Sequence, residues 1–538
     1  MDSVSRATPF VHLFETESCK YAYDVNTMRV VRLNEASDAL LRHWGQNEEE
    51  LSRALGGRFS RDELALAKRR IEGASSRDEV FSTRRPAEVR RPETRDAVQR
   101  CLSTDCQQLI LCASEQCNMR CAYCVYGGGR PPRRGHSPRK MSWDIAKRAI
   151  EFYRERCGRT LERYRQSKRE LGSSEARRGN EPKVPPCVSF YGGEPLLNLA
   201  LVKRSLEYAR ALPEGEDYML RMTTNGTLLS PSVAEFLVQH SVGISVSLDG
   251  PREVHDRYRR FVDGSGTFDV ITRNLRHIRA HHPEYYDRHV GVLAVLSPPV
   301  DWERLLDFYL HFDLLPPMGT FNALDSDCPP TFLEALSPED LVPRGEDELW
   351  EEFVKFALEG RMNAEYQPRT KSERSKISFL RKVFDSTVIH MYSRTRHACE
   401  RQASVPSVLP ISCGMCVPGQ LRTYVDVDGN FFPCERVPEG SIDLRIGDLD
   451  RGYDIDAIMR LMHESVAMTA DVCINCWNVR TCTIPCAQIV GPDGRLSRES
   501  KLRACEQARR RSHYALVSMC RILEKDGKAL SYLDGVLP

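Results

Sequence analysis

Three closely spaced cysteines between Cys117 and Cys124 are the residues of this chain best suited to chemistry. The segment is Cys-Asn-Met-Arg-Cys-Ala-Tyr-Cys, and it follows the apolar run Leu109-Ile110-Leu111-Cys112, which predicts a buried strand. Cysteine thiolates are the usual protein ligands of iron–sulfur clusters. Three of them can hold three irons of a cubane cluster and leave the fourth iron open to a small molecule.

Zinc and disulfide bonds are the alternatives for these cysteines. A structural zinc site usually pairs two Cys-x-x-Cys knuckles or adds histidines, and the nearest histidine, His136, lies beyond a loop rich in Gly, Pro and Arg. Disulfides need an oxidising compartment, and the N-terminus has no apolar segment of the kind that directs export, so we expect a cytoplasmic protein. The residues favour an iron–sulfur cluster, and zinc stays open as an alternative.

The segment resembles the signature of the radical S-adenosylmethionine (SAM) family, which has three cysteines at this spacing and an aromatic residue, here Tyr123, before the third. The resemblance implies that Cys117, Cys121 and Cys124 bind a [4Fe-4S] cluster whose open iron chelates the amino and carboxylate groups of SAM. In that family an electron cleaves SAM to methionine and a 5′-deoxyadenosyl radical, which abstracts hydrogen from an unactivated C–H bond. The electron would come from an external reductant such as flavodoxin or ferredoxin.

Alternating strand and helix patterns between Gln107 and Leu324 surround this segment. Apolar, β-branched runs predict the strands Leu109–Ala113, Val188–Tyr191, Tyr218–Thr223, Gly243–Ser247, Val290–Leu296 and Thr320–Ala323. Amphipathic runs predict the helices Trp143–Arg156, Leu199–Leu212, Ser232–Gln239, Phe268–His281 and Trp302–Phe312. This order predicts an α/β fold with a parallel barrel of six β/α units and function at the carboxyl ends of the strands. The resemblance implies a partial (β/α)6 barrel of the radical SAM type. The polar segment 156–186 predicts a surface insertion.

Tyr191-Gly192-Gly193-Glu194-Pro195 follows the second predicted strand. Glycines let a backbone approach a ligand closely, and a carboxylate can hold an ammonium group. Alone, this sequence is also an ordinary turn. By resemblance to the family, Glu194 would bind the amino group of SAM, and Gly192 and Gly193 would shape the pocket.

Ser245-Val246-Ser247-Leu248-Asp249-Gly250-Pro251 follows the fourth predicted strand, and an arginine-rich segment comes next. Turn chemistry is the alternative for the Asp-Gly step. The resemblance implies that Ser247 contacts SAM and that Arg259 binds its carboxylate, a task suited to the guanidinium fork. Arg257 and Arg260 lie close enough in the sequence to leave this choice of arginine open.

Eight of the 20 cysteines lie between Cys413 and Cys505. Cys416 and Cys434 flank Gly429, and then come Cys473-x2-Cys476-x5-Cys482-x3-Cys486 and finally Cys505. A zinc knuckle is the alternative, although histidine partners are missing from the right places. The order resembles the SPASM domain, which holds two auxiliary [4Fe-4S] clusters. By that resemblance one cluster takes Cys416, Cys434 and Cys486, with Cys413 a candidate fourth ligand, and the other takes Cys473, Cys476, Cys482 and Cys505.

Glu435, directly after Cys434, is the candidate catalytic residue. Auxiliary clusters could accept the electron that leaves when a substrate radical forms a new bond. In relatives that convert a sulfatase cysteine or serine to formylglycine, an acid at this position acts as a base. Glutamate followed by Arg436 resembles the peptide thioether maturases more closely.

The N-terminal segment predicts a separate small module. Two β-prone runs around a polar turn predict a hairpin between residues 9 and 33. Helices are predicted at Ala36–Trp44, Asn47–Leu55 and Ser60–Ala74, the last two with capping boxes. This winged-helix-like module resembles the peptide-recognition module of maturases of ribosomally made peptides (RiPPs), which adds a leader peptide as an extra strand. The alternative is an adaptor that packs on the next domain.

The predicted domain limits and the composition complete the expectation. The segments are the recognition-like module 1–75, a linker 76–105, the radical SAM core 106–325, bridging helices 326–405, the SPASM domain 406–510 and a C-terminal helix 511–538. With 41% hydrophobic and 28% charged residues the composition is that of a globular protein. Interleaved acids and bases at a net charge of +2 argue against nucleic acid, and no apolar run long enough to span a membrane occurs.

The sequence therefore predicts a radical SAM/SPASM oxidoreductase that acts on a precursor peptide with a leader and installs a thioether or another side-chain crosslink. Two alternatives stay open. One is an anaerobic sulfatase maturase that generates formylglycine. The other is a zinc-binding scaffold without catalysis.

Overall fold

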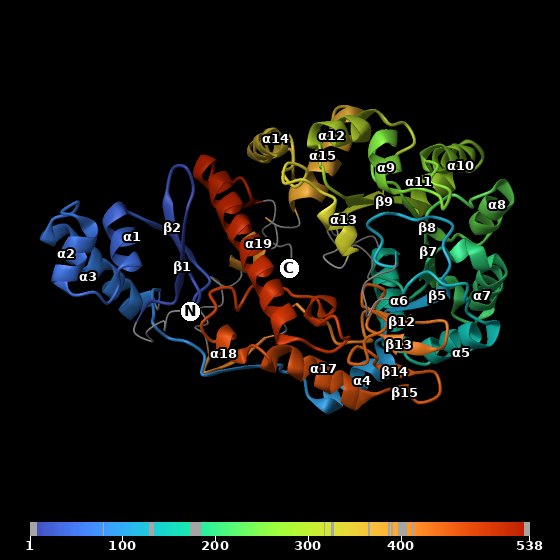
Figure 1. Ribbon diagram of the computed structural model, residues 1–538, viewed down its shortest axis with the longest axis horizontal. Helices are drawn as coiled ribbons and strands as arrows, with labels where there is room; N and C mark the ends of the chain where they lie inside the picture. Colours follow the sequence, from blue (N-terminus) through green and yellow to red (C-terminus); the bar gives the residue numbers. More distant parts are fainter. Residues whose placement is uncertain are drawn as a thin grey trace.

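The computed structural model describes residues 8–78, 80–127, 134–172, 184–316, 318–323, 328–363, 366–385, 388, 391–395, 406–411 and 414–531. In these ranges the largest sheet has the order β10-β9-β8-β7-β6-β5-β12-β13-β14-β15. Figure 1 shows this sheet and its helices beside the long helix α19, with the N-terminal module on the other side of α19. The sheet holds the segments predicted to carry the chemistry.

Six parallel strands form the first part of the sheet. They are β5 (Gln108–Ser114), β6 (Cys187–Gly192), β7 (Met219–Thr224), β8 (Gly243–Ser247), β9 (Val290–Leu296) and β10 (Met318–Ala323). The helices between them are α5 (Trp143–Arg154), α6 (Gly158–Gly172), α7 (Leu199–Ala211), α8 (Pro231–Gln239), α9 (Arg252–Tyr258), α10 (Phe268–His281), α11 (Pro283–His289) and α12 (Trp302–His311). Parallel neighbours in chain order, joined by helices, agree with the predicted β/α order. Helix α6 fills the first part of the predicted insertion, and residues 173–183 lie outside the described residues.

The sheet continues past β5 into the C-terminal cysteine region. Strand β5 pairs in parallel with β12 (Thr423–Val425), which leads through antiparallel pairs to β13 (Asn430–Phe432), β14 (Gly447–Asp448) and β15 (Gly452–Tyr453). Tyr424 and Phe431 are fully buried in the same core as Leu111 and Val188. The two regions thus share one apolar core, and in the described residues β5 pairs with β12 and not with β10.

The N-terminal module contains the elements that the sequence predicts. An antiparallel sheet of β1 (Val11–Glu15), β2 (Lys20–Asp24) and β3 (Val30–Leu33) precedes α1 (Glu35–Arg42), α2 (Glu48–Leu55) and α3 (Arg61–Asp78). The capping box of Asn47 and Glu50 is formed at the start of α2. The backbone and hydroxyl of Ser60 bond to the Glu63 carboxylate before α3.

The predicted linker 76–105 is wrong, because much of this segment is folded. Strand β4 (Glu88–Arg90) pairs in parallel with β11 (Val408–Pro410), and α4 (Arg95–Thr104) buries Val98 and Leu102. Arg91 is buried, and its Nη1 donates to the Met415 carbonyl at 3.0 Å. The charged composition hid these contacts, because they form with residues more than 300 positions away.

The C-terminal half is mainly helical outside the sheet. Its elements are α13 (Pro330–Glu334), α14 (Glu346–Leu358), α15 (Lys371–Leu380), the π-helical turn η3 (Arg381–Asp385), α17 (Ile455–Ala467), α18 (Ala470–Cys473) and α19 (Arg498–Lys525). Short 3-10 turns are η1 (Pro195–Asn198), η2 (Gly215–Asp217) and η4 (Cys486–Ile489). The predicted start of the last helix at 511 is wrong, since α19 begins at Arg498 and contains Cys505. In the described ranges every helix is too short or too polar to cross a membrane.

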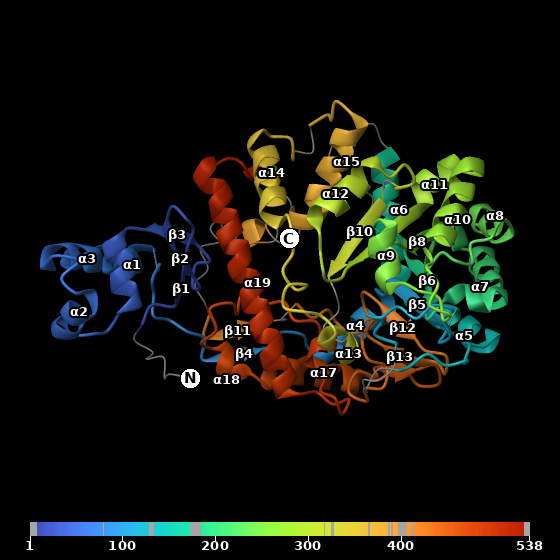
Figure 2. The same cartoon turned by 45° about the horizontal axis from the view of Figure 1, so that its top comes forward.

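The N-terminal module packs on α19 and on the loop after Cys476 (Figure 2). The His12 ring stacks on Trp477 with centroids 3.8 Å apart, and its Nε2 lies 2.9 Å from Nδ1 of His513 on α19. Arg480 donates to the carbonyls of Val25 and Asn26. The module is therefore fixed to the segment that carries Cys473, Cys476 and Cys482.

Acidification is expected to weaken this docking. Burial, and secondarily the neighbouring His513, lower the pKa of His12 from 6.5 to about 4. The unfolded chain then binds more protons than the folded one between these values, so stability falls as the pH drops from 6.5 to 4, by at most about 3 kcal/mol. His12→Phe keeps a ring on Trp477 and removes the titration. In thermal unfolding experiments across this pH range, the stability of the wild type should fall more steeply with decreasing pH than that of His12→Phe. Equal slopes of stability against pH would contradict the assignment of this titration to His12.

Candidate functional site

The triple-cysteine segment forms two tight turns directly after β5. The amide of Cys124 donates to the Cys121 carbonyl at 3.0 Å, and the amide of Gly127 donates to the Cys124 carbonyl at 2.8 Å. Burial is the main cause that raises the pKa of each of the three thiols, and a neighbouring thiol raises it further: Cys121 acts on Cys117, Cys124 on Cys121, and Cys117 on Cys124, as expected for thiols that lie near one another. The structure thus brings the predicted ligands Cys117, Cys121 and Cys124 together.

The environment of these thiols fits a cluster. Burial raises the pKa of Cys117 to about 11 and that of Cys121 to about 12, so the thiolates need a positive partner such as iron. The Asn225 amide contacts the Cys117 sulfur at 3.8 Å, and an Arg259 nitrogen lies 3.9 Å from the Cys121 sulfur. In the part of the chain that the structure describes, no three His, Cys, Asp or Glu side chains converge closely enough to hold one ion. A cubane cluster has a different requirement, since each cysteine binds a separate iron.

Gly192 and Gly193 bring β6 against the segment that leads into Cys117. Gly192 has a φ of +131°, and a Cβ there would lie 2.3 Å from the Ser114 carbonyl oxygen. A Cβ on Gly193 would lie 2.4 Å from the Gln116 carbonyl oxygen. The amides of Gly193 and Glu194 donate to these two oxygens at 2.7 and 2.9 Å. A close approach of two chain segments therefore requires glycine at both positions, and their predicted role in shaping the SAM pocket stays a prediction.

Glu194 lies where the ends of β6 and β7 meet. Its side chain is fully buried, and its carboxylate accepts hydrogen bonds from the Leu196 amide at 3.1 Å, the Thr224 hydroxyl at 2.8 Å and the Asn225 amide at 2.7 Å. Burial raises its pKa to about 7. The carboxylate ties the ends of β6 and β7 together, and Oε2 accepts only the Asn225 amide among the described residues, so the predicted contact with the amino group of SAM stays a prediction.

Asp249, which the sequence reasoning did not select, joins the cysteine segment to β8 and β9. Its Oδ2 accepts from Nε of Arg259 at 2.8 Å and from the Tyr123 hydroxyl, and its Oδ1 accepts from the Val295 amide at 2.9 Å. Arg259 also lies over the Tyr123 ring, 5.3 Å from the centroid. The carboxylate therefore orients both Arg259 and Tyr123 beside Cys121. The Leu-Asp-Gly sequence after a predicted strand was the available signal.

The remaining predicted SAM contacts, Ser247 and one of three arginines, differ in what surrounds them in the structure. Ser247, at the end of β8, is half-buried, and within the described ranges its hydroxyl makes no hydrogen bond, so it is available to a ligand. Arg257 donates to the Pro299 carbonyl and Arg260 to the Gly264 carbonyl. Of the three arginines, Arg259 is therefore the one beside the cysteines.

Two sets of neighbouring cysteines are found in the described part of the C-terminal region. After burial, Cys434 and then Cys416 raise the pKa of Cys486; after burial and Glu435, Cys416 raises that of Cys434, so these three thiols lie together. The candidate fourth ligand, Cys413, lies outside the described residues. Cys473 and Cys476 share one turn, in which the Cys476 amide donates to the Cys473 carbonyl at 3.1 Å. Their predicted partners are Cys482, in the loop that follows, and Cys505, on α19.

Glu435 lies between the C-terminal region and the cysteine segment. Its Oε1 accepts from Nη1 of Arg422 at 2.8 Å, while its Oε2 is buried and has no hydrogen-bond partner in the described part of the chain. Its carbonyl accepts from the Tyr126 hydroxyl, two residues after Cys124. After burial, Glu435 and then Cys124 raise the pKa of Tyr191, which places both near this ring. A carboxylate oxygen without a hydrogen-bond donor among the described residues suits a proton acceptor.

Comparisons with known proteins match the part of the chain that contains the three cysteines after β5. Residues 112–310 match the model of the radical SAM superfamily. The serine-type anaerobic sulfatase-maturating enzyme of Bacteroides thetaiotaomicron is 25% identical over 198 residues, which cover 36% of this chain and 40% of that enzyme. The radical SAM cyclopropyl synthase TigE of Paramaledivibacter caminithermalis is 30% identical over 162 residues, 29% of this chain and 30% of the synthase.

A solved structure of anSMEcpe with bound AdoMet and the Cp18Cys peptide is 16% identical, covers 78% of this chain and 99% of its own, and has a TM-score of 0.46. The chain spans less than half the length of either curated relative above. The matched segment includes the three cysteines after β5 and the ends of β6 and β8. A radical SAM domain implies a [4Fe-4S] cluster and SAM. The chain therefore contains a radical SAM domain, and its relatives include sulfatase maturases and a radical SAM cyclopropyl synthase.

Proposed function

We propose that this chain is a radical SAM enzyme that oxidatively modifies a ribosomally made precursor peptide, by a thioether or another side-chain crosslink. The observation that carries the proposal is the position of Glu435. Glu435 lies near Cys124 and Tyr126, at the end of the segment that carries the three cysteines, and its buried Oε2 has no hydrogen-bond partner in the described residues. A substrate residue between them would meet a hydrogen-abstracting centre on one side and a base on the other.

The side chains have separate tasks in this proposal. Cys117, Cys121 and Cys124 hold the cluster, which together with SAM would supply the hydrogen-abstracting radical. Arg259, oriented by Asp249, binds the SAM carboxylate, and the free hydroxyl of Ser247 binds a polar group of the same molecule. Glu435 takes a proton from the substrate group that forms the new bond.

The C-terminal cysteines have a proposed role in removing the electron that this reaction releases. A crosslink removes two hydrogens from the peptide, one as an atom and one as a proton, and one electron must leave with the new bond. Two auxiliary [4Fe-4S] clusters, held by the cysteines between Cys416 and Cys505, would take up that electron.

The N-terminal module is the proposed site of the leader peptide. Strand β1 faces α19, whereas β3 pairs only with β2 among the described strands. The unpaired edge of β3 can accept an extended peptide as a further strand. Because the module is fixed to α19 and Trp477, a leader held there would reach the core at a constant distance.

A precursor peptide encoded next to this chain tests the proposal. Incubated with anaerobic enzyme, SAM and dithionite, the peptide should lose two hydrogens by mass spectrometry and give no reaction with an aldehyde reagent. Glu435→Gln should cut product formation by about 100-fold and keep deoxyadenosine release, because the base acts after hydrogen abstraction. Asp443→Asn, which weakens a surface pair with Arg495 in the same region, is the control.

A sulfatase-type activity is the second candidate, and the curated relative from Bacteroides thetaiotaomicron supports it. It predicts an aldehyde on a sulfatase-derived peptide and no change in the precursor. Purified protein that contains zinc in place of iron and sulfide would instead support a scaffold without catalysis.

A further inference from the structure

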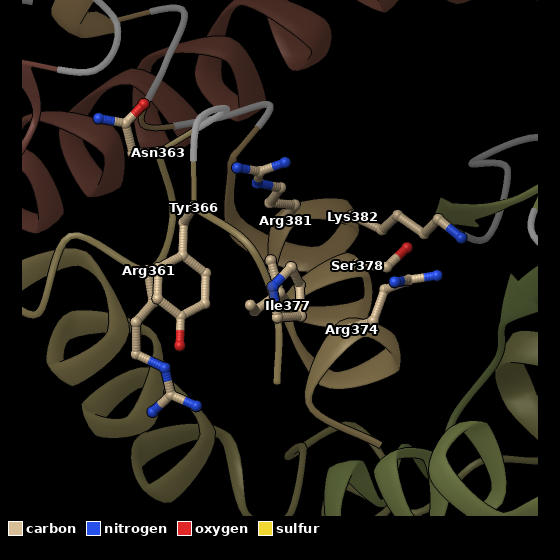
Figure 3. A pocket seen from close by; sticks show the side chains of 9 residues that line it. Arg361, Asn363, Tyr366, Arg374, Ile377, Ser378, Arg381 and Lys382 are labelled. Atoms are coloured by element: carbon tan, nitrogen blue, oxygen red, sulfur yellow. The ribbon is translucent and has the colours of Figure 1, made fainter. Parts of the chain in front are cut away.

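A cavity of about 440 Å³ lies beside α15, away from the cysteines (Figure 3). Its volume is within the range of small-molecule sites. Four of its lining residues are arginine or lysine, and none is acidic; the lining is Arg361, Asn363, Tyr366, Pro368, Arg374, Ile377, Ser378, Arg381 and Lys382. The function proposed above gives this cavity no role.

The cations of the cavity differ in how they are compensated. Arg361 pairs with Glu359 at 3.0 Å and with Glu373, and its guanidinium stacks on Phe356. Arg374 and Lys382 form no ion pair with any residue in the described ranges. Burial lowers the pKa of Lys382, as expected for an ammonium group without a counter-ion. The cavity thus carries positive charge that no ion pair among the described residues neutralises.

Helical spacing places the two cations without an ion pair and a serine hydroxyl in one row. Arg374, Ser378 and Lys382 are four residues apart, so they share a face of α15 and its π-helical continuation η3. Figure 3 shows their polar ends directed to the same side. In the described part of the chain the Ser378 hydroxyl has no hydrogen-bond partner, and the Lys382 amine lies against β10, 3.4 Å from where a Cβ of Gly319 would be. A π-turn inside a helix is a frequent feature of functional sites.

We propose that Arg374, Ser378 and Lys382 form a binding site for an oxyanion, the phosphate or carboxylate group of a small ligand. A guanidinium fork and an ammonium group give charge-assisted hydrogen bonds to such a group, and the hydroxyl adds a neutral donor. Arg381 adds positive charge at the cavity wall, where its Nε is buried without an acceptor in the described residues. A bound anion would relieve the repulsion between these cations.

Titration calorimetry on the full chain at fixed ionic strength tests this site with two probes, inorganic phosphate and citrate. At least one probe should bind the wild type at one equivalent, and the stronger one identifies the preferred group. The double variant Arg374→Gln/Lys382→Gln should bind at least tenfold more weakly, and Ser378→Ala several-fold more weakly. Lys376→Gln removes a charge from the same helix, but Lys376 pairs with Glu352 outside the cavity lining, so binding should stay within twofold.

Failure of both probes to bind the wild type, or equal binding by the double variant, would overturn the site. Circular dichroism and thermal unfolding establish that each variant is folded before titration. Neither iron nor SAM turnover enters the measurement, so its outcome is independent of the function proposed above.

Discussion

Replacing Cys121 with alanine is expected to reduce SAM cleavage by at least about 1,000-fold, equivalent to about 4 kcal/mol of activation free energy. The reason is that two cysteines cannot hold the cluster that the three thiols after β5 are placed to bind. The measurement is the release of deoxyadenosine from SAM under dithionite, together with iron and sulfide analysis of the anaerobically purified protein. The iron content of the variant should be lower than that of the wild type by the amount of iron in one cluster.

Cys101→Ala is the matched control for this variant. Cys101 is a half-buried cysteine on α4, outside the segment after β5 and outside both C-terminal groups. Its replacement should leave iron content and deoxyadenosine release unchanged. Undiminished deoxyadenosine release by Cys121→Ala would refute both the cluster assignment and the proposed function.

The strands that carry the site could be predicted because their signals are local. The predicted bounds of Gly243–Ser247, Val290–Leu296 and Phe268–His281 equal those of β8, β9 and α10. Gly243–Ser247 begins at glycine and ends at serine, Phe268–His281 is amphipathic and ends at histidine, and Val290–Leu296 is an apolar run between His289 and Ser297. A buried parallel strand with such limits leaves little choice of position.

Pairing between distant segments was not predictable. Strand β12 has only three residues, too few for a period, and its partner β5 lies more than 300 residues earlier. The same holds for β4 and β11, whose pairing turns the predicted linker into a folded segment. Such short strands form because the core around Tyr424 and Leu111 buries them, and a single sequence contains no trace of that contact.

The site shows the same limit at the level of single carboxylates. Spacing placed Glu194 and Asp249 correctly after β6 and β8. Spacing could not reveal which groups hydrogen-bond to these carboxylates. The Glu194 carboxylate accepts from backbone amides and the Thr224 hydroxyl, and the Asp249 carboxylate accepts from Arg259 and Tyr123. These partners depend on how neighbouring strand ends align, which the residue order alone does not determine.

Asp249→Ala is expected to lower the free energy of unfolding of the radical SAM domain by about 3–5 kcal/mol. The substitution leaves the guanidinium of Arg259, which is 8% exposed, without its ion-pair partner, and it also removes the acceptor of the Tyr123 hydroxyl and the Val295 amide. Urea unfolding followed by hydrogen exchange in β8 and β9 measures this loss. Because Arg259 is the proposed ligand of the SAM carboxylate, SAM affinity should fall as well.

Asp269→Ala is the matched control, because Asp269 pairs with Arg252 in the same domain while both side chains are more than half exposed. Exposed ion pairs contribute little in water, so this variant should unfold at nearly the wild-type urea concentration and bind SAM normally. Equal stability losses in the two variants would show that burial of the Asp249 pair does not matter. A loss of stability in Asp249→Ala without a loss of SAM affinity would leave Asp249 as a structural residue that is not needed to orient Arg259 toward SAM.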